Sequence, residues 1–303
     1  MILGILCRWE NALSQFASLV KTMRPKQWAK NAFVMAALVF DKKLFVPYYL
    51  ARALAAFVLF CAISSVVYLV NDVLDAEKDR QHPAKRNRPI ASGELTARMA
   101  LVAAAVLGTV SILCSFLLDP LFGLIAAGYL FLMSLYSLWL KHVVLVDVMT
   151  VATGFVLRVA AGVAIVRAAR FSPWLYLCMV FLALFIAIGK RRHELVLLNE
   201  NANAHRSIFE EYNSALLDDM IRMVSASTAM AYSLYTFSAP NLPQNHAMML
   251  TIPLVLYALF RYMYLIQVKG EGGTPEELIL SDKPLLLAVL LWVLSAVLIM
   301  YLL

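Results

Sequence analysis

Long apolar runs separated by short charged segments make up most of the chain. Nine such runs lie at about residues 28–40, 48–70, 97–118, 121–140, 144–166, 173–189, 219–238, 248–268 and 284–302. A helix of about 20 residues crosses the ~30 Å of hydrocarbon in a bilayer. Lipid tolerates only α-helices and closed barrels, and these runs are too long and too apolar for barrel strands. The pattern therefore predicts an all-α polytopic membrane protein with nine transmembrane helices.

Composition agrees with this prediction. Of the 303 residues, 62% are hydrophobic and 15% are charged, whereas soluble domains carry about 25% charged residues. The four cysteines are far apart, which favours neither a disulfide framework nor a zinc site. No low-complexity linker interrupts the pattern, so we expect residues 1–303 to form one transmembrane domain.

Basic residues gather on one side of the predicted membrane. Of the 26 lysines and arginines, 18 fall in or beside the loops 1–27, 71–96, 141–142, 190–217 and 269–283. Because cytoplasmic loops collect lysine and arginine, we expect these segments to form cytoplasmic caps of a multi-pass protein of the cell (plasma) membrane. The same rule accounts for the net charge of +7, so nucleic acid is not an expected partner.

The segment "NDVLDAEKD" (71–79) follows the second apolar run and carries the clearest chemical pattern. Asp72, Asp75 and Asp79 are spaced i, i+3 and i+7, which places them on one face of a helix, with Asn71 beside them. Carboxylates this close repel one another, and a divalent cation removes that repulsion. Mg²⁺ is commonly held by one or two carboxylates together with substrate phosphates. We therefore expect these four side chains to bind Mg²⁺.

The residues after this segment are basic. Lys85 and Arg88 can neutralise phosphate charge, and Ser92 or Thr96 can cap the next helix. The alternative interpretation is an ordinary helix end with solvated mixed charges. The three acids on one face and the basic residues that follow favour a functional site.

Four further groups of charged residues lie outside this segment. Lys190 and Arg191 can pair with Glu194 at i, i+4 and i, i+3, and Arg222 can pair with Asp218 or Asp219. Lys26 and Lys30 lie one turn apart beside Trp28. For these two lysines, and for Lys190 and Arg191, anchoring at the membrane surface is the alternative to contact with a substrate phosphate.

Lys141 and Asp147 follow the fourth apolar run, and Arg158 lies eleven residues after Asp147 on the same helix face. Ionisable groups inside a membrane usually face a cavity or a partner, so Arg158 either pairs internally or contacts a phosphate. The sequence leaves the roles of Asp147 and Glu194 open.

"NDVLDAEKD" is similar to the first Asp-rich motif, NDxxDxxxD, of the UbiA superfamily of intramembrane prenyltransferases, whose nine helices also fit. Five further segments resemble its decaprenyl-phosphate phosphoribosyltransferase branch. They are "RPKQWAKN" (24–31), "DRQHPAKRNRPIASGEL" (79–95), "YSLWLKHVVLVDVMTVATGFVLRVAAG" (136–162), "KRRHEL" (190–195) and "EGGTPEELILSDKPLL" (271–286). The first motif specifies the superfamily, and the others together are typical of the branch.

This resemblance implies a Mg²⁺-dependent transfer of 5-phosphoribose from phosphoribosyl pyrophosphate to a polyprenyl phosphate, as a step toward cell-wall arabinan. The residues expected to be catalytic are Asp72, Asp75, Asp79, Lys85 and Arg88. Those expected to bind substrate phosphates are Lys26, Lys30, Asn71, Lys141, Arg158, Lys190 and Arg191. The active site is expected to face the cytoplasm.

Two other functions fit less well. A conventional UbiA enzyme joins a polyprenyl diphosphate to an aromatic acceptor and usually carries a second motif, DxxxD, which the loop after residue 189 lacks. A transporter or flippase for an anionic lipid would line both faces of the membrane with charge, whereas the charges here gather on one. The sequence leaves open the polyprenyl length, whether one or two Mg²⁺ bind, and which cation binds which phosphate. It also leaves the oligomeric state open, and it is compatible with an oligomer.

Overall fold

A computed structural model describes residues 14–81, 85–168, 172–197, 211–272 and 275–303. Within these ranges the regular structure is α-helix and 3-10 helix, with no strand. The chain divides into two compact units, each described by itself. Unit 1 comprises residues 1–32 and 55–139, and unit 2 comprises residues 33–54 and 140–303. An all-α fold is thus confirmed, while the expectation of one domain stays a prediction.

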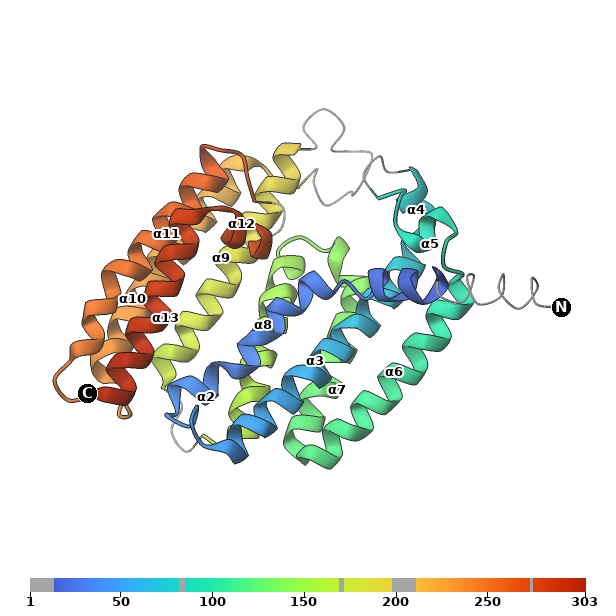
Figure 1. The fold of residues 1–303 in the computed structure, drawn as a ribbon. Helices are drawn as coiled ribbons and strands as arrows, with labels where there is room; N and C mark the ends of the chain where they lie inside the picture. The colour runs from blue at the N-terminus through green and yellow to red at the C-terminus, as the bar shows by residue number, and fades with distance from the viewer. Residues whose placement is uncertain (1–13, 82–84, 169–171, 198–210, 273–274) are drawn as a thin grey trace. The chain divides into compact units, whose positions relative to one another are not determined.

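Unit 1 contains most of α3 (Pro47–Leu74), the short helices α4 (Ala76–Gln81) and α5 (Pro89–Ser92), and the hairpin of α6 (Ala97–Leu118) and α7 (Pro120–Leu138) (Figure 1). Thr96 caps α6 by accepting a bond from the Met99 amide, which confirms one of the two predicted caps. Asp119 caps α7 in the same way and is the single residue between the paired helices.

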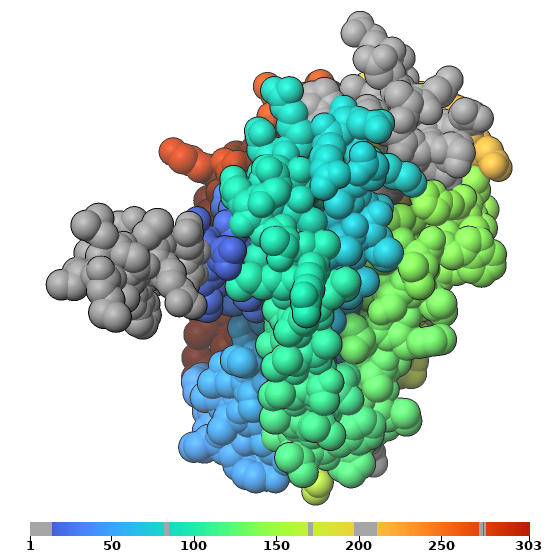
Figure 2. Space-filling model, turned by 90° about the vertical axis from the view of Figure 1, so that its right-hand side faces the viewer, coloured from blue at the N-terminus to red at the C-terminus, as the bar shows by residue number. Residues whose placement is uncertain are grey.

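Helix α6 has its large side chains outside and its small ones inside. Its buried positions are Ala100, Ala104, Gly108, Ser111 and Ser115. Its exposed positions include Leu101, Val102, Val106, Val110, Leu113, Phe116 and Leu117, and the helix runs along the surface shown in Figure 2. Small residues let helix backbones approach closely, and lipid accepts the large apolar ones. This polarity is the reverse of a water-soluble helix and is typical of a membrane span.

Unit 2 is built around α9 (Pro173–Leu197), which packs against both α8 (Val146–Val166) and α10 (Ser214–Ser238). Helices α11 (Ile252–Gln267) and α13 (Lys283–Leu302) pack against each other. The shorter elements are α2 (Ala36–Phe40), η2 (Leu140–His142), η5 (Ala247–Thr251) and α12 (Pro275–Ser281), while η1 (Pro25–Met35) starts in unit 1 and ends in unit 2.

Seven helices in the described part of the chain are long and apolar enough to cross a membrane. They coincide with seven of the nine predicted spans. The other two predicted spans are also helical: 28–40 corresponds to η1 and α2, and 219–238 lies within α10. A multi-pass membrane protein is therefore supported, while the count of nine spans stays a prediction.

A close backbone contact fixes α8 within unit 2. A Cβ added at Gly162 would overlap the carbonyl oxygen of Val34, at the end of η1. Backbone cannot move aside as the tip of a side chain can, so this position requires glycine. Gly128 of α7 offers a matched comparison, because nothing lies within 4 Å of an added Cβ there.

We predict that Gly162→Ala lowers the free energy of unfolding by about 1–3 kcal/mol, because η1 and α8 must move apart. Gly128→Ala should be neutral or stabilising, since alanine is favoured over glycine in a helix by about 1 kcal/mol. Denaturant titration of both purified variants measures the difference. Equal stability of the two would contradict the close contact between Gly162 and Val34.

Candidate functional site

The predicted acidic face forms where α3 passes into α4. The Asp75 amide bonds the Asn71 carbonyl at 2.9 Å, and the Asp79 amide bonds the Asp75 carbonyl at 2.8 Å, so helical geometry continues through the junction. Asp72 and Asp79 are buried, Asp75 is half-buried, and Glu77 points outward as an exposed residue. The helical spacing thus separates the three aspartates from Glu77 as predicted.

Two arginines neutralise this face. Arg24 Nη2 lies 2.5 Å from Asp72 Oδ1. Arg88 Nη1 lies 2.6 Å from Asp79 Oδ2 and 3.3 Å from Asp72 Oδ1, so one nitrogen bridges two carboxylates that are two turns apart. We call Arg24, Asp72, Asp79 and Arg88 the arginine–aspartate cluster; all four belong to unit 1.

Local structure places Arg88 at this position. Its amide bonds the Lys85 carbonyl at 2.9 Å, which closes a turn directly before α5. Pro89 begins α5 and Gly93 ends it in the left-handed conformation at φ 87°, which glycine adopts without strain. Lys85 shares the same turn and is half-buried.

The segment around Arg24 is tied to α3 by side-chain bonds. Trp28 Nε1 donates to Ser65 Oγ at 3.1 Å, and Asn31 Nδ2 donates to Ser64 Oγ at 3.1 Å. Lys30 donates to Gln27 on the same segment at 2.5 Å, and Lys26 is exposed.

The donor set of the arginine–aspartate cluster fits a hard divalent cation. Asp72 and Asp79 each offer carboxylate oxygen, and the bridging Arg88 nitrogen shows that one cationic atom reaches both. Two carboxylates with substrate phosphates and water make a common Mg²⁺ site. The described residues contain no group of three His, Cys, Asp or Glu arranged to hold a metal, so metal binding by Asp72, Asp75 and Asp79 stays a prediction.

A second charged cluster lies in unit 2. Arg191 Nη2 lies 2.6 Å from Asp147 Oδ2, and Arg191 Nη1 lies 2.6 Å from Glu194 Oε2. The Tyr212 hydroxyl donates to Asp147 Oδ1 at 2.8 Å. The side chains of Arg191 and Asp147 are 6% and 0% exposed, so this ion pair is closed to water. We call these four residues the Arg191 cluster.

The Tyr212 hydroxyl also accepts a hydrogen bond from the backbone. The Leu145 amide donates to the Tyr212 hydroxyl at 2.8 Å, and Leu145 has a left-handed backbone at φ 64°, which leucine rarely adopts. Burial raises the pKa of Tyr212, and the hydrogen bond to Asp147 raises it further. The hydroxyl therefore stays protonated and donates to the carboxylate throughout the physiological pH range.

The other predicted cations of unit 2 fall into buried and exposed groups. Arg158 is buried, donates to the Gly154 carbonyl at 2.8 Å and lies over the ring of Phe155, so it makes internal contacts. Lys141 is buried in η2. Lys190 is exposed, with its Nζ 4.0 Å from Glu194 Oε1. The predicted pairs of Glu194 are thus confirmed.

The prediction that Arg222 pairs with Asp218 or Asp219 is confirmed. Arg222 pairs with Asp219 at 2.5 Å, one of the two alternatives. Asp218 instead pairs with Arg192 of α9 at 2.6 Å, a contact between helices that the local spacing could not indicate.

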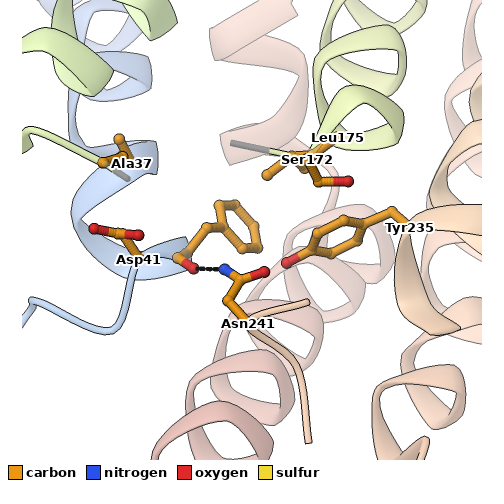
Figure 3. Close-up of a pocket in the computed structure, with 8 residues that line it drawn as sticks. Ala37, Asp41, Ser172, Leu175, Tyr235 and Asn241 are labelled. Carbon is orange, nitrogen blue, oxygen red and sulfur yellow. Dashed lines mark hydrogen bonds between the residues drawn. The ribbon is translucent and has the colours of Figure 1, made fainter. Parts of the chain in front are cut away.

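Unit 2 also contains a small cavity, between the end of α2 and the adjoining ends of α9 and α10 (Figure 3). Tyr235, Asn241 and Ser172 line it, and Asn241 donates to the Phe40 carbonyl. The volume open to the centre of a water molecule is about 10 Å³, room for one water and too little for a phosphate. Ser172 and Arg191 lie near opposite ends of α9, so this cavity is remote from the Arg191 cluster.

Sequence reasoning missed two residues of these clusters. Arg24 begins the segment 24–31 but received no predicted role, because its separation of 48 residues from Asp72 hides the pairing. Tyr212 carries no sequence signal, because it lies 65 residues from Asp147.

Comparisons with known proteins agree with one another. A model of the UbiA prenyltransferase family matches residues 31–274. Decaprenyl-phosphate phosphoribosyltransferases from Mycobacterium tuberculosis and Corynebacterium glutamicum are each 34% identical, over 91% and 93% of this chain and 92% and 86% of their own. A solved UbiA homologue from Archaeoglobus fulgidus, bound to GPP and Mg²⁺, has a TM-score of 0.73 at 18% identity and covers 93% of this chain and 99% of that one. At that identity the likeness shows the fold alone.

We predict that Asp147→Asn lowers the free energy of unfolding by about 3 kcal/mol, because it leaves the buried Arg191 guanidinium without its fully buried counter-ion. Asp219→Asn is the matched control, since Asp219 also pairs with an arginine but is 72% exposed. That change should cost less than about 1 kcal/mol. Denaturant titrations of the two variants measure this difference. A loss of unfolding free energy in Asp147→Asn no larger than that in Asp219→Asn would contradict a structural role for the Arg191 cluster.

Proposed function

The chain belongs to the UbiA prenyltransferase family, and on that premise we propose that it transfers 5-phosphoribose from phosphoribosyl pyrophosphate to a polyprenyl phosphate. Its products are then polyprenylphosphoryl-5-phosphoribose and diphosphate. Support comes from the curated relatives at 34% identity, which are named decaprenyl-phosphate phosphoribosyltransferases. The polyprenyl length stays open.

One observation carries this proposal: the arginine–aspartate cluster combines carboxylate oxygens with guanidinium groups at one place. A diphosphate that leaves with a divalent cation needs both kinds of group. The carboxylates of Asp72 and Asp79 can hold the cation, and Arg88 can hold phosphate oxygens. Neither kind of group alone would suit such a leaving group.

The reaction breaks the bond between C1 of the ribose and the diphosphate oxygen, and forms a bond between C1 and an oxygen of the lipid phosphate. The electron pair of the broken bond leaves on the diphosphate. The lipid phosphate is already an anion, so the transfer requires no strong general base. Direct displacement inverts C1, which turns an α-linked donor into a β-linked product.

The residues of the chain divide this work by charge. Asp72 and Asp79, with Asp75 and Asn71 beside them, are the groups that would hold Mg²⁺. When bound, Mg²⁺ supplies positive charge that stabilises the departing diphosphate. Arg88 and Lys85 neutralise charge that develops on the same group. Lys26 and Lys30 in unit 1, and Lys141, Arg158, Lys190 and Arg191 in unit 2, remain our candidates for the 5-phosphate and the lipid phosphate.

The side of the membrane follows from the distribution of lysine and arginine. We propose that the arginine–aspartate cluster faces the cytoplasm of a cell-membrane protein, where a water-soluble donor is available. The polyprenyl chain of the acceptor remains in the bilayer. The product would serve as a precursor of lipid-linked pentose donors for cell-wall arabinan.

The alternative is a conventional enzyme of the family that joins a polyprenyl diphosphate to an aromatic acceptor. Such an enzyme usually has a second acidic motif in the loop after α9. In the last turn of α9, directly before that loop, the acid is Glu194, and Arg191 already pairs with it at 2.6 Å. A second metal site at the end of α9 is therefore disfavoured within the residues that the structure describes.

The acidic face gives a prediction with an internal control. Asp72→Asn, Asp75→Asn and Asp79→Asn keep side-chain size and remove charge, so we expect each to reduce kcat/KM at least about 100-fold. Glu77→Gln makes the same change on the exposed side of the helix and should cost little. Initial rates of sugar transfer measure this, and equal losses at Glu77 and Asp75 would contradict the role of the face.

The identity of the donor separates the proposal from its alternative. Purified protein in Mg²⁺ should transfer radiolabelled phosphoribose to a polyprenyl monophosphate, and the lipid product should be β-linked by NMR. Chelation of the divalent cation should abolish the transfer. Turnover of a polyprenyl diphosphate with an aromatic acid, and none with phosphoribosyl pyrophosphate, would establish the conventional reaction instead.

A further inference from the structure

Arg24 has an unusual backbone conformation, and its guanidinium group makes two contacts, one with Tyr68 and one with Asp72. The Arg24 backbone is left-handed, with φ 54°, although arginine has a Cβ that makes this conformation unfavourable. Its guanidinium carbon lies 4.9 Å from the centre of the Tyr68 ring, within range of a cation–π contact. Its Nη2 lies 2.5 Å from Asp72 Oδ1. Strained backbone of this kind tends to occur at ligand sites, which makes Arg24 a candidate for more than packing.

The contacts of Asp72 explain what Arg24 does. Arg24 and Arg88 both bond the same oxygen, Oδ1, of a carboxylate whose side chain is 2% exposed. A divalent cation that bound Asp72 through both oxygens would need Oδ1, which the two arginines contact, and it would compete with both for the charge of the carboxylate. A cation that takes Oδ1 therefore displaces one of the two arginines.

Arg24 is the arginine better placed to leave. Arg88 is also bonded to Asp79 at 2.6 Å, so it keeps a carboxylate whatever happens at Asp72. Within the described residues, Asp72 is the carboxylate partner of Arg24. The Arg24 side chain is 28% exposed and so has room to turn. Its planar fork of donors suits the adjacent oxygens of a diphosphate.

We propose that Arg24 is an exchangeable counter-ion: it neutralises Asp72 until a divalent cation takes its place, and then binds the diphosphate of the donor. The second half rests on the proposed function, whereas the first half does not. Tyr68 keeps the released guanidinium close, because its ring contact is independent of Asp72. The exchange makes cation binding and anion binding support each other.

The first test measures the cation alone. Mn²⁺ serves as the probe, and electron paramagnetic resonance gives its free concentration in a titration of the purified full chain without phosphate. Arg24→Asn removes the competing charge with a residue that tolerates left-handed backbone. We expect this variant to bind Mn²⁺ about tenfold more tightly than the unchanged protein, since it loses one charged hydrogen bond to Asp72.

Arg80→Gln is the matched control. Arg80 is also an arginine paired with an acid of this segment, Glu77, at 2.6 Å, but that pair is exposed. We expect Mn²⁺ affinity within about twofold of the unchanged protein, because an exposed pair contributes little. Equal tightening in both variants would show a general charge effect and overturn the exchange.

A second variant guards against loss of folding. Arg24→Lys keeps the charge but loses the planar fork, so it should compete less well and give an Mn²⁺ affinity between those of the unchanged protein and Arg24→Asn. Unchanged or weaker Mn²⁺ binding in the folded Arg24 variants would overturn the proposal.

The second test measures the anion. Radiolabelled inorganic pyrophosphate is bound to immobilised protein at a fixed free Mn²⁺ concentration, and Arg24→Asn should retain it about tenfold more weakly. Normal retention by that variant would overturn the diphosphate contact. Because neither test uses phosphoribosyl pyrophosphate, a failure here in a protein that transfers phosphoribose rejects the role of Arg24 and leaves the proposed function intact.

Discussion

Two buried carboxylates on long apolar helices determine how the rest of the charge is arranged. Asp72 near the end of α3 and Asp147 at the start of α8 are 2% and 0% exposed. An ionised carboxylate in such surroundings is costly unless a cation and hydrogen bonds compensate it. Each is met by arginine, Asp72 by Arg24 and Arg88, and Asp147 by Arg191. Residues distant in sequence must therefore come together for these helices to be stable in lipid.

Both clusters neutralise a buried carboxylate with arginine, but they differ in how easily a ligand could replace the arginine. In the Arg191 cluster the ion pair is closed to water, and Tyr212 and Glu194 also contact it, so a ligand would have to break buried charge–charge contacts. In the arginine–aspartate cluster the guanidinium groups are 28% and 27% exposed and one of them is shared between two acids. Exchange is far less costly there. Of the two phosphate candidates at the end of α9, the exposed Lys190 is therefore more accessible than Arg191.

The spacing of residues along the sequence predicted the features that depend on one helix alone. The apolar runs gave seven helices suited to a membrane, and the i, i+7 spacing gave a common face for Asp72 and Asp79. The Thr96 cap and the pairs of Glu194 also follow from neighbouring residues. Contacts between helices were beyond this reasoning, as Asp218 shows by pairing with Arg192 instead of Arg222. Such contacts depend on how helices pack, which small residues such as Gly162 control and which one sequence alone does not specify.

The positions of the clusters along their helices agree with the proposed chemistry. Asp72 lies near the C-terminal end of α3, Asp147 in the first turn of α8, and Arg191 in the last two turns of α9. By the distribution of lysine and arginine, all three helix ends belong to the predicted cytoplasmic side. On the proposed function, the lipid phosphate would reside at that boundary and the charged sugar donor would reach it from water. Helix ends at such a boundary can use buried charge for chemistry, whereas exposed large apolar side chains such as those of α6 suit the hydrocarbon of the bilayer.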